Sequence, residues 1–224
     1  FCPGRAWEQV RTNLALNNAN VKIAGCHAGL NVGPDGATHQ AIEDMAIMRC
    51  IPNMVVLAPC DMIEARKAVV AASLFKGPVY VRLARDKSPV FTTPETPFQI
   101  GRAEVFRQGN DAAIIACGLL VHHALLAAEE LSKQGIECRV IDNHTVKPMD
   151  EKTIIQTAQE CGAVVTVEEH QIMGGMGSAV AEILSQHCPT PQEFVGVRDR
   201  FGETGTPADL IEALGMGVGS IQQA

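Results

Sequence analysis

Residues 26–53 hold most of the side chains in this chain that could do chemistry. His27, Asp35 and His39 lie on a segment with three glycines, which lets the backbone fold closely around a ligand. An imidazole titrates near neutral pH, so the two histidines can bind an anionic phosphate when charged or transfer a proton when neutral. The pattern therefore indicates a site for a small phosphorylated substrate.

Arg85 is a second candidate, because it lies just beyond the strand predicted at 79–83. Its guanidinium fork fits a phosphate, and the carboxyl end of a strand is where open α/β sheets bind ligands. A solvated arginine at a domain edge is the alternative interpretation. Arg82 lies inside the same predicted strand and is expected to be structural.

A second glycine-rich segment has a similar composition. Glu168, Glu169 and His170 precede glycines at 174, 175 and 177, in the manner of a phosphate cradle that opens a helix. The segment lacks the dinucleotide-binding glycine spacing and a Walker lysine. A structural or interface role is therefore favoured. No group of residues has metal-ligand spacing, so we predict no metal site on this chain.

Length and composition restrict the class of protein. The 224 residues exceed one typical domain, and 46% hydrophobic with 19% charged residues is ordinary for a globular protein. The net charge of -7 includes no basic run, and one Trp and one Tyr give few rings for base stacking, so we expect no nucleic-acid partner. The longest apolar stretch, 112–128, is broken by Gly118 and two histidines, so we expect no membrane span.

The eight cysteines include no Cys-x-x-Cys pair, and most fall in apolar runs where a reduced thiol packs as a small hydrophobe. This usage indicates a reducing compartment, and no secretory leader is recognisable. We therefore expect a cytoplasmic protein.

The elements that position these residues alternate between strand and helix. The sequence predicts strands at 21–25, 54–57 and 79–83 and helices at 40–49 and 62–74. This order is typical of parallel βαβ units, and it places His39 at the entrance of the helix 40–49. Asp61 and Glu64 have the spacing of a helix cap with a reciprocal partner.

A second strand and helix series follows a proline-rich segment. Its predicted strands are 113–117, 137–142, 163–168 and 194–197, and its helices are 121–134, 150–161, 178–187 and one that begins at Thr206. We predict an α/β fold with two three-layer α/β domains and mainly parallel sheets. The boundaries are 1–86 for a partial first domain, 87–105 for a linker and 106–224 for the second domain.

Several motifs together resemble the pyrimidine-binding domain of transketolase. They are His27-Ala28-Gly29-x-x-Val32-Gly33-x-Asp35-Gly36-x-Thr38-His39-Gln40, then Arg49-x-Ile51-Pro52-Asn53, and Pro59-x-Asp61. The resemblance continues through Lys147-Pro148-Met149-Asp150 to His170 and so covers essentially the whole chain. In detail the chain is most similar to the C-terminal section of split transketolases.

The resemblance implies thiamine diphosphate as cofactor and transfer of a two-carbon ketol unit between sugar phosphates. Carried over by position, His27 and Arg85 would bind the substrate phosphate. Asp35 would bind a hydroxyl near the reacting carbonyl, and His39 would contact the ketol hydroxyls and assist proton transfer. Phe1 would pack against the aminopyrimidine ring.

The resemblance also implies partners. In the family, the glutamate that activates the cofactor lies upstream of the position of Phe1, and another section binds the pyrophosphate and its Mg²⁺ or Ca²⁺. We therefore expect this chain alone to be inactive, to need the pyrophosphate-binding N-terminal section of a transketolase, and to self-associate at least as a dimer.

Three alternatives remain at this stage. Deoxyxylulose phosphate synthase shares the Asp-Gly-x-Thr-His-Gln core, and the β subunit of 2-oxo acid dehydrogenases shares the architecture. His27 favours transketolase over the synthase, and Arg85 favours it over the dehydrogenase, which has no sugar phosphate to bind. The alternative from a different class is a noncatalytic interaction module.

Overall fold

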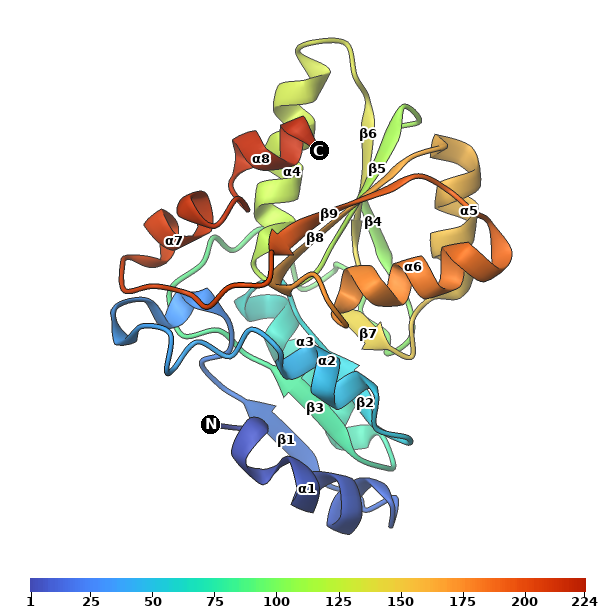
Figure 1. Cartoon of the computed structure of the whole chain (residues 1–224). Coiled ribbons are helices and arrows are strands. Elements are labelled where there is room, and N and C mark those ends of the chain that lie inside the picture. Colours follow the sequence, from blue (N-terminus) through green and yellow to red (C-terminus); the bar gives the residue numbers. More distant parts are fainter.

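The computed structural model describes residues 1–224 as an α/β protein with two sheets (Figure 1). The first sheet has the order β1-β3-β2-β7. Its strands are β1 (Lys22–Gly25), β2 (Val55–Leu57), β3 (Val79–Arg82) and β7 (Thr145–Lys147). β3 pairs in parallel with both β1 and β2, whereas β7 adds an antiparallel edge beside β2.

The second sheet has the order β4-β6-β5-β8-β9. Its strands are β4 (Glu104–Arg107), β5 (Ala112–Ala116), β6 (Cys138–Asp142), β8 (Val164–Gln171) and β9 (Gln192–Val197). Only the edge strand β4 is antiparallel to its neighbour. The predicted α/β class with mainly parallel sheets is therefore confirmed.

Helices cover both sheets, as Figure 1 shows. The α-helices are α1 (Trp7–Gln9), α2 (Asp44–Arg49), α3 (Met62–Leu74), α4 (Leu120–Ser132), α5 (Glu151–Cys161), α6 (Met176–His187), α7 (Pro207–Ala213) and α8 (Val218–Gln223). A short 3₁₀ turn precedes α1, and a π-helical segment, Val10–Ala15, continues it. None of the helices is long and apolar enough to cross a membrane.

The helix starts follow from side-chain caps. The Asp61 carboxylate accepts the Glu64 N–H at 2.9 Å, and the Glu64 carboxylate accepts the Cys60 N–H at 2.7 Å. This reciprocal cap confirms the predicted start of α3. Thr206 caps α7 in the same way, and Pro207 occupies the first helical position, where it needs no N–H partner.

One apolar cluster joins the two sheets. It combines Met45 of α2 and Tyr80 of β3 with Ile115 of β5, Ile154 of α5 and Val180 of α6, all at most 1% exposed. A second cluster packs α4 against the opposite face of the second sheet. The first cluster contains residues from both sheets. Packing within it therefore fixes the position of the first sheet against the second.

The helix predicted at 40–49 begins only at Asp44, so the placement of His39 at a helix entrance is wrong. Gly29 donates its N–H to Ala41 at 2.8 Å, and this bridge keeps the backbone before α2 out of the helix. The Gln40 side chain is buried and donates to the carbonyl of Gly33. These tertiary contacts override the helical spacing of the side chains.

Two further expectations need correction. β4 lies partly inside the predicted linker 87–105, and β7 comes from the second series yet joins the first sheet. Both strands pair with strands distant in the chain, β4 with β6 and β7 with β2, so no local signal in the sequence marks them. The two units are thus linked by a strand as well as by a shared core.

Candidate functional site

Two neighbouring strands bring the candidate residues to one edge of the first sheet. β1 and β3 run parallel with Gly25 opposite Arg82, so the loops that follow them leave at the same end. Ala28 donates its N–H to Leu83 at 3.1 Å, which fastens the two loops together. The edge is the carboxyl end of parallel strands, the usual location of ligand sites in α/β sheets.

Asp35 and Arg85 form an ion pair at this edge. The Arg85 Nη1 atom lies 2.7 Å from Asp35 Oδ2 and also donates to the Val32 carbonyl at 3.0 Å. The Asp35 side chain is 40% exposed and that of Arg85 is 42% exposed. A pair this exposed contributes at most about 1 kcal/mol, so an anionic substrate can compete with Asp35 for the guanidinium.

Asn31 positions this pair through hydrogen bonds to the backbone. The sequence did not point to this residue. Its side-chain carbonyl accepts the Arg85 N–H at 2.6 Å, and its side-chain amide donates to the Ala28 carbonyl at 2.8 Å. Its own N–H donates to the buried carboxylate of Glu169 at 2.7 Å. The available signal was an asparagine in a glycine-rich loop, because its side chain readily hydrogen-bonds to nearby backbone groups.

A second buried network lies under the loop. Arg82 Nε lies 2.9 Å from the Asp44 carboxylate, the Tyr80 hydroxyl donates to that carboxylate at 2.7 Å, and Arg82 Nη2 donates to the Glu169 carbonyl at 2.8 Å. Burial alone would lower the pKa of Arg82, but Asp44 and Glu169 reverse the shift and raise it. Burial, followed by the charge of Asp44, raises the pKa of Tyr80. These contacts support the structural role predicted for Arg82.

His39 and Phe1 meet on the other side of the loop. Their ring centroids are 5.1 Å apart at an interplanar angle of 65°, and the Arg5 guanidinium lies 4.3 Å from the centroid of the Phe1 ring. The His39 Nδ1 atom is 2.9 Å from the Thr38 hydroxyl, and Nε2 has no partner within the chain. Nε2 is therefore available to a ligand.

A cavity of about 180 Å³ lies beside these two rings. Glu43 of the loop and Phe201 of the segment after β9 also line it. Phe201 is 80% exposed and was missed by the sequence analysis, although it is the one aromatic residue in a polar stretch. Aromatic rings and an imidazole around an open cavity suit a flat heteroaromatic ring.

His27 stands apart from both pairs. It is exposed, and its side chain makes no hydrogen bond or ion pair within the chain. Its φ of 61° places it in the left-handed region, which histidine tolerates better than most residues. The structure thus joins Asp35 with Arg85 and His39 with Phe1, and it brings His27 into contact with neither pair.

The segment after β9 holds the loop in place. Gln40 Nε2 donates to the Glu203 carbonyl at 2.9 Å. A Cβ atom on Gly33 would lie 3.2 Å from Pro207 of α7 and 3.3 Å from the Gly205 carbonyl oxygen. Gly33 also has a φ of 70°, so the backbone conformation favours glycine there and the space beside it is tight. The second sheet therefore shapes the loop that carries the candidate residues.

The glycine-rich segment after β8 is filled by the chain itself. The Glu168 carboxylate accepts the N–H groups of Met176 at 2.7 Å and Gly177 at 2.9 Å, and so caps α6. His170 Nε2 accepts the Ala46 N–H of α2 at 3.3 Å, and its Nδ1 lies 2.7 Å from the Gln171 carbonyl. Both ring nitrogens are used, which supports the structural interpretation of this segment.

Burial affects the acids of this segment strongly. It raises the pKa of Glu168 against the opposing effect of His170, and that of Glu169 against the opposing effect of Arg82. Both carboxyl groups are at most 2% exposed. Glu168 caps α6 within the second unit, whereas Glu169 joins the second sheet to the loop after β1 through Asn31.

Comparisons with known proteins place both sheets in described domain families. Residues 1–90 match the family "Transketolase, pyrimidine binding domain", and residues 101–221 match "Transketolase, C-terminal domain". A solved structure described as "Split gene transketolase, inactive beta4 tetramer" superposes with a TM-score of 0.94 at 44% identity, covering 100% of this chain and 71% of that chain.

Curated relatives agree with these matches. A 6-deoxy-6-sulfo-D-fructose transketolase subunit from a Clostridium species is 42% identical over 224 residues, covering 100% of this chain and 70% of the relative. An apulose-4-phosphate transketolase subunit of Phocaeicola vulgatus is 37% identical over 217 residues, with 96% and 69% covered. The 1-deoxy-D-xylulose-5-phosphate synthase of Trichormus variabilis is 39% identical over 217 residues, and the chain spans only 34% of its length.

Proposed function

The chain belongs to the transketolase family, and from this premise we propose that it is the substrate-facing subunit of an enzyme that transfers a two-carbon ketol unit between phosphorylated sugars. The observation that carries the proposal is the pair of arrangements at one sheet edge: a cationic one around Arg85 and an aromatic one around His39. The first suits the anionic end of a sugar, and the second suits its reacting end.

The anionic end of the substrate is assigned to Arg85 and His27. The chain carries a net charge of -7, so an anionic sugar must be attracted by local cations rather than by the whole surface. The Arg85 guanidinium is exposed and is held by a weak ion pair and by one hydrogen bond to the Val32 carbonyl, and the His27 side chain has no hydrogen bond or ion pair within the chain. Both groups can therefore bind a phosphate without breaking the fold.

The reacting end is assigned to His39 and Asp35. His39 presents an unpaired Nε2 atom, which can donate to or accept from a ketol hydroxyl and so hold or move its proton. The Asp35 carboxylate becomes available to a substrate hydroxyl once the phosphate engages Arg85. A single substrate could thus rearrange the ion pair on binding.

The family's cofactor fits the residues present. The cavity of about 180 Å³ beside Phe1, His39, Glu43 and Phe201 offers ring faces and edges for a flat aminopyrimidine. Thiamine diphosphate supplies the nucleophilic carbon and the electron sink that ketol transfer requires. We propose that Phe1 packs against its ring, while the partner section holds the pyrophosphate and its Mg²⁺ or Ca²⁺.

Partner chains are supported by the names of the relatives. Two of them are named as transketolase subunits, and the structure at TM-score 0.94 is described as an inactive tetramer of a split-gene transketolase. We propose that the present chain self-associates, is inactive by itself and works with an N-terminal section that binds pyrophosphate. The proposed setting is the cytoplasm.

A second candidate is deoxyxylulose phosphate synthesis, because a synthase is 39% identical to the chain. The two activities differ in the donor: a ketose phosphate for transketolase and a 2-oxo acid for the synthase. The split-gene transketolase structure, 44% identical over the whole of this chain against 39% for the synthase, favours ketol transfer.

The test is a ketol-transfer assay from xylulose 5-phosphate to ribose 5-phosphate with thiamine diphosphate and magnesium. The complete native gene product is assayed alone and with its N-terminal partner section. Turnover only in the mixture is the expected result. Turnover with pyruvate and glyceraldehyde 3-phosphate instead would support the synthase, and no turnover with either pair would favour a noncatalytic module.

A further inference from the structure

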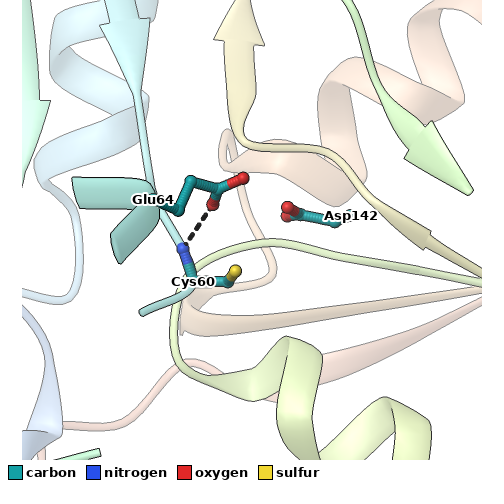
Figure 2. Close-up of side chains that lie close together, drawn as sticks. All are labelled: Cys60, Glu64 and Asp142. Atoms are coloured by element: carbon teal, nitrogen blue, oxygen red, sulfur yellow. Dashed lines mark hydrogen bonds between the residues drawn. The ribbon is translucent and has the colours of Figure 1, made fainter. Parts of the chain in front are cut away.

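Three side chains that take no part in the proposed site gather where the two sheets meet. They are Cys60, Glu64 and Asp142, and Figure 2 shows Asp142 facing Glu64 across the junction. Cys60 and Asp142 are 0% exposed and Glu64 is 1% exposed. The Cys60 thiol sulfur and the nearest oxygens of the two carboxyl groups all lie within 4.8 Å of one another.

The hydrogen bonds of the cluster are incomplete. One Glu64 oxygen accepts the Cys60 N–H at 2.7 Å, drawn as a dashed line in Figure 2, while the other oxygen has no donor. Neither Asp142 oxygen has a donor. A carboxylate in this state loses its hydration without compensation, at a cost of several kcal/mol, on the order of the penalty for a buried unpaired charge.

No cationic side chain compensates the two acids. The neighbouring titratable groups are Asp61, Glu104, Cys117 and His144. Asp61 binds the N–H groups of Phe91 and Thr92, burial raises the pKa of Glu104 and of Cys117, and burial lowers the pKa of His144, which favours its neutral form. The pair therefore needs a cation of another kind, either a metal ion or a proton.

The donor set does not suit a metal ion. A structural zinc site takes four protein ligands, and magnesium or calcium takes six or more oxygen atoms, whereas this cluster offers one sulfur and two carboxyl groups. Burial raises the pKa of the Cys60 thiol, and the neighbouring acids raise it further, so without a metal ion the sulfur keeps its proton.

We propose that Glu64 and Asp142 share one proton and so form a hydrogen-bonded carboxyl pair that locks the two sheets together. Asp142 is the carboxylic acid and donates its O–H to the free oxygen of the Glu64 carboxylate. Glu64 belongs to α3 beside the first sheet, and Asp142 ends β6 of the second. A shared proton, rather than an ion pair, therefore connects the two sheets at this point.

The pKa shift of Asp142 agrees with this arrangement. Burial raises it well above the ordinary value, and the neighbouring Glu64 raises it further, both by its charge and by hydrogen bonding to the acid. The Cys60 thiol opposes this rise without reversing it. A raised pKa in the folded state means that folding takes up a proton above the ordinary aspartate pKa. Stability is then full below that pKa and falls as the pH rises toward the folded-state value.

Asp142→Asn tests the proposal, because an amide can donate the same hydrogen bond without a proton from solvent. The free energy of unfolding is measured in urea from pH 5 to 9 at a fixed protein concentration. The folding constant of Asp142→Asn relative to wild type is expected to rise about tenfold per pH unit until the folded-state pKa is reached. Glu64→Gln should likewise make the free energy of unfolding less dependent on pH than in wild type.

The matched control is Asp44→Asn, which removes an equally buried carboxylate that has Arg82 as its cation. This variant is expected to be less stable than wild type at every pH. A folding constant of Asp142→Asn that tracks wild type at all pH values overturns the proposal, as does failure of Asp142→Asn to fold. One metal ion per wild-type chain by elemental analysis, lost in Asp142→Asn, also overturns it and assigns a metal site instead.

Discussion

The two glycine-rich segments of this protein look alike in sequence and differ in what the fold does with them. The loop 26–41 after β1 exposes His27, Asp35 and His39, and its only side-chain ion pair is open to solvent. The end of β8 and the glycine-rich segment after it bury Glu168, Glu169 and His170, and both acids and the imidazole are paired within the chain. The first segment leaves polar groups free for a ligand, and the second uses its polar groups in contacts within the fold.

The difference shows what distinguishes a binding loop from a structural one. Glycines near a strand end and polar side chains occur in both, so residue type does not separate them. What separates them is whether hydrogen-bonding groups remain free once the chain has folded. In the segment after β8 the start of α6 is already capped by a carboxylate, so no phosphate is needed there.

Among changes to the buried contacts, Arg82→Met is expected to have the largest effect on stability. The change removes the cation that pairs with Asp44 and leaves its buried carboxylate with the Tyr80 hydroxyl but no opposite charge. Breaking a buried pair by removing one partner costs about 3–5 kcal/mol. We expect a loss of that size in the free energy of unfolding, measured by urea denaturation. A loss below about 1 kcal/mol would contradict the assigned structural role.

The exposed side is probed by Arg85→Ala in the assembled enzyme. The change removes a charged hydrogen bond to the anionic end of the sugar, worth about 1.5–3 kcal/mol, so KM for a sugar phosphate should rise roughly 10- to 150-fold. Stability should change by less than about 0.5 kcal/mol, because the ion pair with Asp35 is exposed.

The control for Arg85→Ala is a sugar substrate that lacks the phosphate. KM for the same sugar without its phosphate should be equal in wild type and Arg85→Ala, and Arg85→Lys should recover part of the loss. If both sugars were affected alike, Arg85 would be orienting the loop rather than binding the anion.

A smaller effect is expected from Gly177→Ala at the start of α6. A Cβ atom there would lie 2.6 Å from the Thr166 hydroxyl and 2.9 Å from the Phe194 ring. Such overpacking costs about 1–3 kcal/mol, so the melting temperature should fall while turnover per folded molecule stays unchanged. A large loss of turnover at full stability would instead place this segment in a binding site.

Much of the fold could be predicted from the sequence because its signals are local. The caps at Asp61 and Thr206 mark the starts of α3 and α7 where they were expected. The start of α2 was wrong, because the buried Gln40 side chain and the bridge to Ala41 hold the preceding residues in place. β7 was missed because its pairing with β2 joins residues distant in the chain.

The candidate site likewise has some features that the sequence predicts and others that only the folded structure shows. Motif residues predicted from the family resemblance lie at one sheet edge, since parallel strands end there together. The roles of Asn31 and Phe201 depend on contacts with Glu169 and with the cavity beside His39, and no spacing along the chain encodes those contacts. The roles of the exposed residues themselves remain predictions for the assembled enzyme.

One matched pair of variants tests the central claim most directly: His39→Ala and His170→Ala, compared for ketol turnover and melting temperature in the assembled enzyme. We predict that His39→Ala lowers kcat about 10²- to 10⁴-fold with an unchanged melting temperature, as expected for a lost proton-transfer group. We predict that His170→Ala lowers the melting temperature and leaves turnover per folded molecule intact, because its imidazole joins α2 to the second sheet. Unchanged turnover in His39→Ala, or loss of turnover without loss of stability in His170→Ala, would contradict the account.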